Sequence, residues 1–139
     1  MHVILRFNLE QKIFNENINL KDIPELWNQE YKRLFAKEVD NDSNGCLQDV
    51  HWYAGLFGYF PTYSLGALTA AQLASQLRED IKNLDQQVEK GDFNELIKWL
   101  KLNIHSKASL YSTNEILQQV TNSELNAKYF MDYIKNRYL

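Results

Sequence analysis

Apolar residues recur every three or four positions along most of the chain, which is the spacing that places side chains on one face of an α-helix. The longest such stripe takes steps of four, four, three and four residues and consists of Leu73, Leu77, Ile81, Leu84 and Val88. Two prolines and five glycines are few for 139 residues. The pattern therefore predicts an all-α chain of about six helices.

Capping and breaking residues divide the pattern. We expect helices over residues 2–14, 22–36, 63–90, 92–104, 112–120 and from 126 onward, with a further helical stretch that begins near 48 and is interrupted at 58–61. Pro24 suits a first helical turn, and Gly91 suits a left-handed C-terminal cap. The Asp92/Glu95 and Ser112/Glu115 pairs each have the spacing of a capping box.

Two of the expected helices have a clear inward face. In the first helix the residues expected to face inward are Val3, Ile4, Phe7, Ile13 and Phe14. In the second helix they are Trp27, Tyr31, Leu34 and Phe35. Residues 37–45, rich in Asp, Asn, Ser and Gly, are expected to form a loop.

Residues 52–77 carry no formal charge, and the segment is long enough to span a bilayer. It contains Pro61, three glycines and several hydroxyl groups, and it lacks the density of Leu, Ile and Val that a membrane span needs. A buried helix-turn-helix is therefore favoured. A helix that is apolar almost all round needs neighbours on every side, and this indicates that the chain is part of a larger protein.

Composition and charge exclude some partners. The chain is 45% hydrophobic and 24% charged, with a net charge of −3. Its 15 Lys and Arg residues are scattered, so neither nucleic acid nor a membrane surface is an expected partner. The single cysteine, Cys46, has no disulfide partner, and the apolar run after His2 is too short for a signal peptide. A cytoplasmic protein is expected.

A calcium site is the first candidate for chemistry. Asp40, Asp42, Asn44 and Gly45 match the start of an EF-hand loop, but its twelfth position is His51 and not a bidentate Glu. A solvated acidic loop is favoured.

Zinc binding and nucleophilic catalysis have little support. The three histidines, His2, His51 and His105, form no His-Glu-x-x-His motif. On a helix, Asp49 and His51 would point about 200° away from each other. Cys46 has no basic residue beside it to activate a thiolate. We therefore expect no metal site on this chain.

Gln48, Asp49 and His51 form a polar group within very apolar surroundings. Tyr63 follows His51 by 12 residues, a separation of about 18 Å along a straight helix. Gly58 and Pro61 should break that helix, which would allow the two side chains to converge. The residues alone still favour a core histidine with satisfied hydrogen bonds over a functional one.

Two motifs resemble a known family. Gly-x-x-Gln-Asp-x-His-Trp at 45–52, followed by Gly-Leu-Phe-Gly-Tyr-Phe-Pro-Thr-Tyr-x-Leu-Gly at 55–66, closely resembles the carboxypeptidase Taq family of zinc metallocarboxypeptidases. The segment His-Val-Ile-Leu-Arg-Phe at 2–7 resembles the helix after the family's Ile-Arg-x-x-Ala-Asp motif. The resemblance extends over essentially the whole chain.

The resemblance implies an all-helical, neurolysin-like fold and an enzyme, usually dimeric, that removes single C-terminal residues from peptides. It also implies that residues 1–139 are a single C-terminal segment, roughly the last quarter to third of the enzyme, and that the zinc-binding helix lies upstream. Zinc is thus implied for the complete enzyme and not for this chain, which would be inactive alone.

The resemblance also assigns roles. His51 and Tyr63 would donate hydrogen bonds to the oxyanion of the tetrahedral intermediate from the cleft wall opposite the zinc. Gln48 and Asp49 would orient His51 or contact the substrate, and Arg6 would contact a substrate carboxylate. With the resemblance, a functional His51 is favoured over a purely structural one.

Two further partners are expected besides a peptide substrate. One is a complementing N-terminal chain that carries the zinc helix, and the other is a second copy of this chain, held by an exposed apolar face. The alternative function is a non-catalytic helical remnant or protein-binding module, in which the same wall is an apolar surface for a partner protein.

Overall fold

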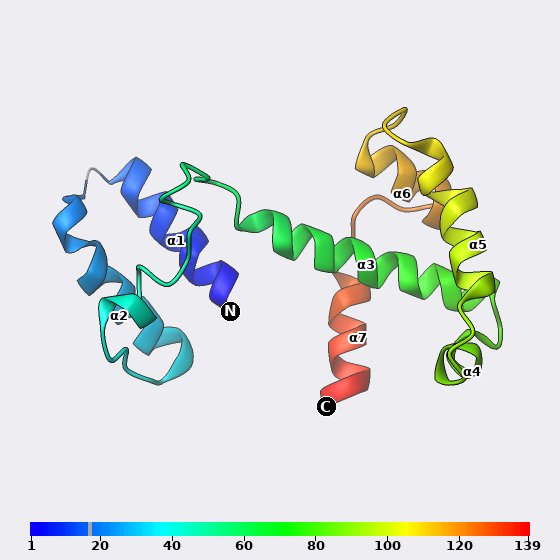
Figure 1. Ribbon diagram of the computed structural model, residues 1–139, viewed down its shortest axis with the longest axis horizontal. Helices are drawn as coiled ribbons and strands as arrows, with labels where there is room; N and C mark the ends of the chain where they lie inside the picture. Colours follow the sequence, from blue (N-terminus) through cyan, green and yellow to red (C-terminus); the bar gives the residue numbers. More distant parts are fainter. Residues whose placement is uncertain (17) are drawn as a thin grey trace. The chain divides into compact units, whose positions relative to one another are not determined.

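Helices make up the regular secondary structure of the residues that the computed structural model describes, 1–16 and 18–139 (Figure 1). The α-helices in this part of the chain are α1 His2–Asn15, α2 Ile23–Phe35, α3 Pro61–Asp80, α4 Leu84–Glu89, α5 Asn94–Asn103, α6 Thr113–Thr121 and α7 Lys128–Tyr138. Short 3-10 turns cover Leu20–Asp22, Asp42–Asn44 and His105–Lys107. The prediction of an all-α chain is confirmed, with seven α-helices in the described residues. They form two compact units, residues 1–64 and 65–139.

The first unit is built on the packing of α1 against α2. Its core consists of Leu5 and Leu9 from α1, Trp27 from α2, and Cys46 from the following loop. Leu5 and Leu9 are four residues apart and so share one face of their helix. Pro24 lies in the first turn of α2 as predicted, and Ala36 ends that helix in the left-handed conformation with φ 52°.

The face of α1 that is buried differs from the predicted one. Leu5, Arg6, Leu9 and Glu10 are buried. Of the residues predicted to face inward, Ile13 packs against the core, whereas Ile4, Phe7 and Phe14 are exposed. Two charged side chains can lie on the inner face because each finds partners there, as described below. The inward face predicted for α2 is confirmed, since Trp27 is buried and Tyr31, Leu34 and Phe35 pack against the same core.

Residues 45–60 form consecutive turns, and the helical stretch predicted from Gln48 is absent from this described segment. Gly55 and Gly58 have φ values of 71° and 76°, in the left-handed region that glycine adopts without steric cost. Backbone bonds close the turns, for example from Leu56 N to His51 O at 2.9 Å. The apolar composition of this segment reflects packing of aromatic rings and not helix formation.

In the second unit the helix predicted over 63–90 is divided in two. Helix α3 ends at Asp80, and α4 begins at Leu84. Ile81 and Leu84 nevertheless pack against the same core around Leu77 and Trp99, so the apolar stripe continues across the break. Trp99 Nε1 of α5 also donates to Asp80 Oδ2 at 2.6 Å, where α3 ends.

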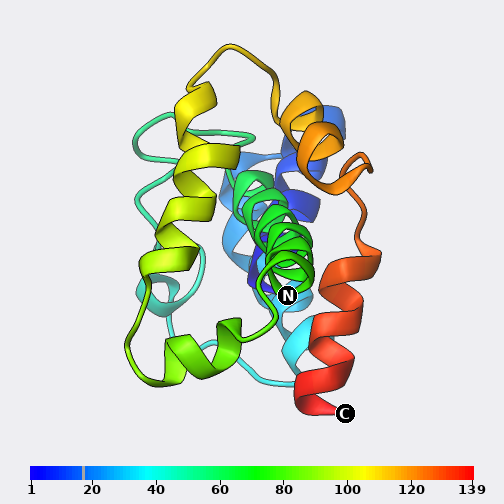
Figure 2. The same ribbon diagram turned by 90° about the vertical axis from the view of Figure 1, so that its right-hand side faces the viewer.

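Figure 2 looks along α3 and shows α5 on one side of it and α6 and α7 on the other. Gln72 of α3 is fully buried and holds the segment after α6. Its Nε2 donates to Thr121 Oγ1 at 2.8 Å, Glu124 O at 3.0 Å and Ser123 O at 3.3 Å, and its Oε1 accepts from Asn126 N at 2.9 Å. One side chain therefore holds the α6–α7 connection along most of its length.

The predicted caps have mixed outcomes. The Ser112/Glu115 capping box is confirmed, and Gly91 has the expected positive φ of 72°. The Asp92/Glu95 capping box is wrong. Asp92 Oδ1 instead accepts from Asn94 N at 3.1 Å, and the Glu95 carboxylate accepts from Gln87 Nε2 at 2.5 Å.

The buried helix-turn-helix predicted for residues 52–77 is wrong for this chain. Along α3 only Gln72 and Leu77 are buried, and Tyr63 and Leu65 are about half exposed at 50% and 49%. Among the described residues, no helix combines the length and the hydropathy that a bilayer span requires.

Candidate functional site

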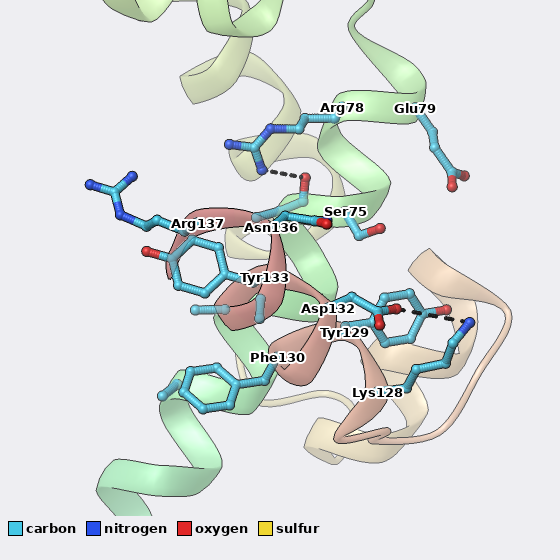
Figure 3. Close-up of a pocket in the computed structure, with 14 residues that line it drawn as sticks. Ser75, Arg78, Glu79, Lys128, Tyr129, Phe130, Asp132, Tyr133, Asn136 and Arg137 are labelled. Carbon is cyan, nitrogen blue, oxygen red and sulfur yellow. Dashed lines mark hydrogen bonds and ion pairs between the residues drawn. The ribbon is translucent and has the colours of Figure 1, made fainter. Parts of the chain in front are cut away.

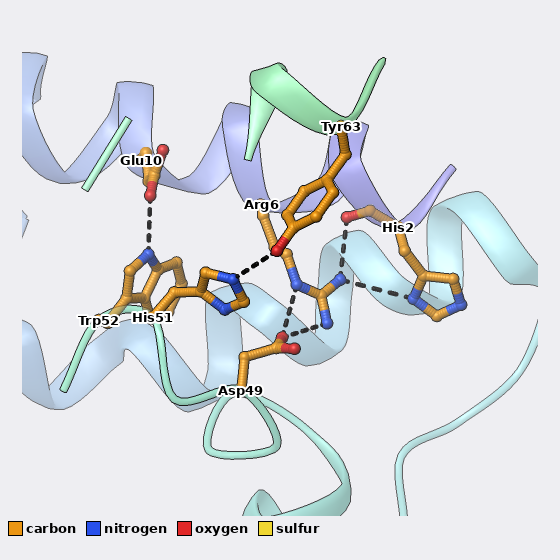
Figure 4. Close-up of polar contacts among 7 residues, drawn as sticks. All are labelled: His2, Arg6, Glu10, Asp49, His51, Trp52 and Tyr63. Carbon is orange, nitrogen blue, oxygen red and sulfur yellow. Dashed lines mark hydrogen bonds and ion pairs between the residues drawn. The ribbon is translucent and has the colours of Figure 1, made fainter. Parts of the chain in front are cut away.

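His51 and Tyr63 lie in contact at the end of the first unit (Figure 4). His51 Nε2 and the Tyr63 hydroxyl are 2.9 Å apart, a hydrogen-bond distance, although the residues are 12 apart in sequence. His51 belongs to the turns of residues 45–60, and Tyr63 to the first turn of α3. The predicted convergence of the two side chains is confirmed. The left-handed residues of the intervening turns are Gly55 and Gly58, whereas the sequence predicted a break at Gly58 and Pro61.

The surroundings of His51 favour one tautomer of the neutral imidazole. Its Nδ1 is buried and has no hydrogen-bond partner among the described residues, and the ring packs on Phe60 with centroids 4.5 Å apart. A buried N–H without a partner is rarer than a buried acceptor without one, which favours the tautomer with the lone pair on Nδ1 and the proton on Nε2. In that tautomer Nε2–H donates to the Tyr63 oxygen, and the half-exposed Tyr63 hydroxyl proton is free to point outward.

Arg6 and Asp49 form a partly buried charge pair beside this site (Figure 4). Arg6 Nε donates to Asp49 Oδ2 at 2.6 Å, and Nη2 forms an ion pair with the same oxygen. Arg6 is only 5% exposed, and its guanidinium lies 4.8 Å from the centre of the Trp27 ring and 5.2 Å from that of Phe60. Such contacts favour a structural role for Arg6, and its predicted contact with a substrate carboxylate stays a prediction.

His2 completes this group. Arg6 Nη1 donates to the His2 carbonyl at 2.9 Å and lies 3.5 Å from His2 Nδ1. Burial lowers the pKa of His2, and the nearby Arg6 and N-terminal charges lower it further. His2 is therefore a neutral neighbour of the charge pair at pH 7.

The other two predicted residues have different positions. Asp49 is partly exposed and is bound to Arg6, so its described contacts orient the turn that carries His51 and not the imidazole itself. Gln48 is exposed, and its backbone N–H donates to Gly45 O at 3.2 Å. The substrate contacts predicted for Gln48 and Asp49 stay predictions.

Sequence reasoning missed Glu10, which is 3% exposed on the inner face of α1. Its carboxylate accepts hydrogen bonds from the turn segment that contains His51. The sequence signal that could have identified Glu10 is its spacing from Arg6. Glu10 follows Arg6 by four residues and so lies on the same helical face. The apolar pattern of the sequence instead predicted an inward face of apolar residues, which does not include Glu10.

A cavity with a volume of about 1200 Å³ lies in the second unit, between α3 and α7. Four alanines of α3 (Ala67, Ala70, Ala71 and Ala74) form one side of it. Aromatic residues of α7, including Tyr129 and Tyr133, form the other (Figure 3). The cavity contains none of the predicted site residues.

A metal ion has no fitting ligand set in the part of the chain that is described. Those residues contain no group of three or more His, Cys, Asp or Glu side chains that could hold one. In the candidate calcium loop, Asn41 Oδ1 accepts from Asn44 N at 3.0 Å and closes a 3-10 turn. The described residues therefore offer no such ligand set for the zinc that the resemblance implies for the complete enzyme.

Known proteins match the chain along almost its whole length. A family model described as carboxypeptidase Taq (M32) metallopeptidase matches residues 1–138. Carboxypeptidase 1 of Bacillus subtilis is 38% identical over 138 residues, which are 99% of this chain and 28% of that protein.

Solved structures agree with the sequence match. The Pyrococcus furiosus carboxypeptidase structure is 40% identical with a TM-score of 0.94 and covers 99% of this chain and 28% of its own. Metallocarboxypeptidase 1 of Trypanosoma cruzi is 39% identical with a TM-score of 0.92, over 99% and 29% of the two chains. The chain thus spans a little over a quarter of the length of these relatives. The predicted resemblance is confirmed, and the chain belongs to the carboxypeptidase Taq (M32) metallopeptidase family.

Proposed function

We propose that this chain forms one wall of the substrate cleft of a zinc-dependent metallocarboxypeptidase, which removes C-terminal residues from peptides. In that enzyme His51 and Tyr63 donate hydrogen bonds to the oxyanion of the tetrahedral intermediate. Membership of the family supports the reaction class. The observation that carries the assignment is the 2.9 Å distance between His51 Nε2 and the Tyr63 hydroxyl.

Two donors this close can serve one oxygen. An oxygen atom can lie at about 2.7–3.1 Å from both His51 Nε2 and Tyr63 Oη at once. Without substrate the two groups bind each other. When negative charge develops on the substrate oxygen, both protons turn toward it, and the hydrogen bonds become stronger because the acceptor is charged. The pair is thus complementary to the transition state more than to the neutral carbonyl.

The chain alone is expected neither to bind zinc tightly nor to hydrolyse peptides, because its described residues offer no fitting ligand set. The remaining groups of the active site would come from the rest of the complete enzyme or from a complementing chain. The relatives have room for them, since this chain covers 28% of the Bacillus subtilis protein.

A chimera tests the proposal. Residues 1–138 replace the matching segment of Bacillus subtilis carboxypeptidase 1, and release of C-terminal amino acids from peptides is measured. We expect chelator-sensitive turnover in the chimera and none from the chain alone. Tyr63→Phe removes one donor and should lower kcat by about 10²–10³. Tyr53→Phe, at an exposed tyrosine, is the matched control and should keep the activity.

Two results would contradict the proposal. One is a folded chimera without activity, and the other is an active chimera in which Tyr63→Phe and Tyr53→Phe turn over equally fast. Robust, chelator-sensitive hydrolysis by the isolated chain would overturn the expectation that it is inactive alone.

The second candidate is a helical remnant or binding module. Exposed apolar side chains on α1, namely Ile4, Phe7 and Phe14, favour it, because such a surface suits a protein partner. The inactive chimera of the preceding test would support this candidate.

A further inference from the structure

One carboxylate on α1 holds two points of the turn segment that carries His51. Trp52 Nε1 donates to Glu10 Oε1 at 2.8 Å (Figure 4), and the backbone N–H of Gly58 donates to Glu10 Oε2 at 3.1 Å. Each oxygen of Glu10 therefore takes one donor. Both bonds span more than 40 residues of sequence, so they are tertiary contacts.

The two donors lie in the segment that connects His51 to Tyr63. Trp52 directly follows His51, and Gly58 begins the short connection through Phe60 and Pro61 to Tyr63. Gly58 has φ 76°, and the backbone of such a turn lacks the regular partners of a helix. Glu10 supplies the missing acceptor there. It consequently fixes the chain immediately after His51 and again shortly before Tyr63.

The chemistry of the contact makes it strong. Glu10 is 3% exposed, and hydrogen bonds to an ionised carboxylate are roughly twice as strong as neutral ones. A carboxylate has only acceptors, so it matches two N–H donors. Glutamine has nearly the same size, but its amide group presents one acceptor and one donor. Because the two donors bind different oxygens of Glu10, the amide NH2 group of glutamine would face one of them.

We propose that Glu10 is a positioning residue, which keeps His51 and Tyr63 within hydrogen-bond distance by holding Trp52 and Gly58. The inference rests on the proposed function only where it concerns the effect of Glu10 on the reaction rate. The positioning itself concerns the His51–Tyr63 bond and can be measured without any turnover.

The test uses the 139-residue chain and the NMR signals of the His51 imidazole ring. Tyr63→Phe defines the spectrum of His51 without its partner. Glu10→Gln is expected to lose the wild-type signals and to reproduce that Tyr63→Phe spectrum. Trp52→Phe, which removes one donor but keeps an aromatic ring, should show the same change in part, and it serves if Glu10→Gln fails to fold.

The matched control is Thr121→Val, which removes the hydrogen bonds of a buried hydroxyl in the second unit with little change in side-chain size. It should lower stability and leave the His51 signals as in the wild type. Wild-type His51 signals in Glu10→Gln and Trp52→Phe would overturn the proposal. So would a His51 spectrum that Tyr63→Phe leaves unchanged, since the bond to be positioned would then be absent.

Activity separates the two proposals. In the chimera, Glu10→Gln should lower kcat with little change in KM, because the Glu10 carboxylate is buried and its described partners are Trp52 and Gly58. If the His51 signals change while Tyr63→Phe leaves kcat intact, the positioning role stands and the oxyanion role fails. If Tyr63→Phe lowers kcat but Glu10→Gln leaves the signals intact, the oxyanion role stands and Glu10 has no positioning role.

Discussion

Arg6 and Asp49 lie 43 residues apart in sequence, and two nitrogens of the arginine fork converge on one oxygen of the aspartate. The pair joins α1 to the turn that precedes His51. Arg6 is almost completely buried, whereas the Asp49 side chain is 31% exposed. The contribution of this ion pair to the free energy of unfolding therefore lies between that of a surface pair and that of a buried pair.

Replacement of Arg6 should destabilise the first unit. Arg6→Leu leaves Asp49 without its charged donor, and we expect a loss of about 1–3 kcal/mol in the free energy of unfolding. Arg6→Lys keeps the charge but loses the planar fork, so its loss should be smaller. Urea unfolding followed by tryptophan fluorescence measures both. Equal stability of Arg6→Leu and wild type would contradict this role.

The pH dependence of stability should have a contribution from Glu30. A hydrogen bond from Arg33 is the main reason that the pKa of Glu30 is lowered to about 2, and a hydrogen bond from Asn8 adds to it. Because the folded pKa lies below the unfolded one, the stabilisation is fully present above about pH 4.5 and is lost as the pH falls toward 2. Because solvent screens the charge of the exposed Arg33, this stabilisation amounts to only about 1 kcal/mol.

Urea midpoints measured between pH 2 and pH 7 test this. Glu30→Gln should remove part of the loss of stability on acidification. Glu38→Gln is the matched control at a fully exposed pair with Lys32 and should alter the pH profile less. Superimposable profiles for Glu30→Gln and wild type would show that Glu30 has no such contribution.

Two glycine-to-alanine substitutions should have opposite effects. A Cβ at Gly45 would lie 2.9 Å from Val39 Cγ1 and 3.2 Å from Asn41 O, so Gly45→Ala should cost about 1–3 kcal/mol. Gly66, inside α3, has nothing within 4 Å of a Cβ, and Gly66→Ala should stabilise by up to about 1 kcal/mol. Thermal unfolding by circular dichroism measures both. A stabilised Gly45→Ala variant would contradict the packing described around Trp27.

Self-association of the chain is the next expectation. Ile4, Phe7 and Phe14 are exposed on α1, and association would remove them from water. Sedimentation velocity should show a mass that rises with concentration above the monomer mass of 16.4 kDa. Phe7→Ser should weaken the effect. A monomer at every concentration would contradict it.

The sequence predicted the helices with strong local signals. For α2, Pro24 in the first turn and the Trp27 stripe gave nearly correct bounds, and for α6 the Ser112 capping box fixed the start. The break between α3 and α4 left no trace in the stripe, because Ile81 and Leu84 face the same core on either side of it. The break between α3 and α4 is therefore determined by tertiary packing and not by the local apolar pattern.

The site was predictable only in part. Gly58 and Pro61 indicated that His51 and Tyr63 could converge, and the resemblance supplied the proposed roles. The buried face of α1 was not predictable from apolar spacing, because Arg6 and Glu10 are charged and are satisfied by partners from residues 49–58. Such long-range partners have no signature in local sequence.

The contacts of Gln72 have a consequence for how this segment can vary during evolution. Of its four hydrogen-bond partners, only Thr121 contributes a side chain, while Ser123, Glu124 and Asn126 contribute main-chain groups. Main-chain carbonyls are present whatever the residue type, and the N–H at 126 is present in every residue except proline. Substitutions at 123, 124 and 126 should therefore be tolerated among relatives, whereas position 72 should accept only an amide of the same length.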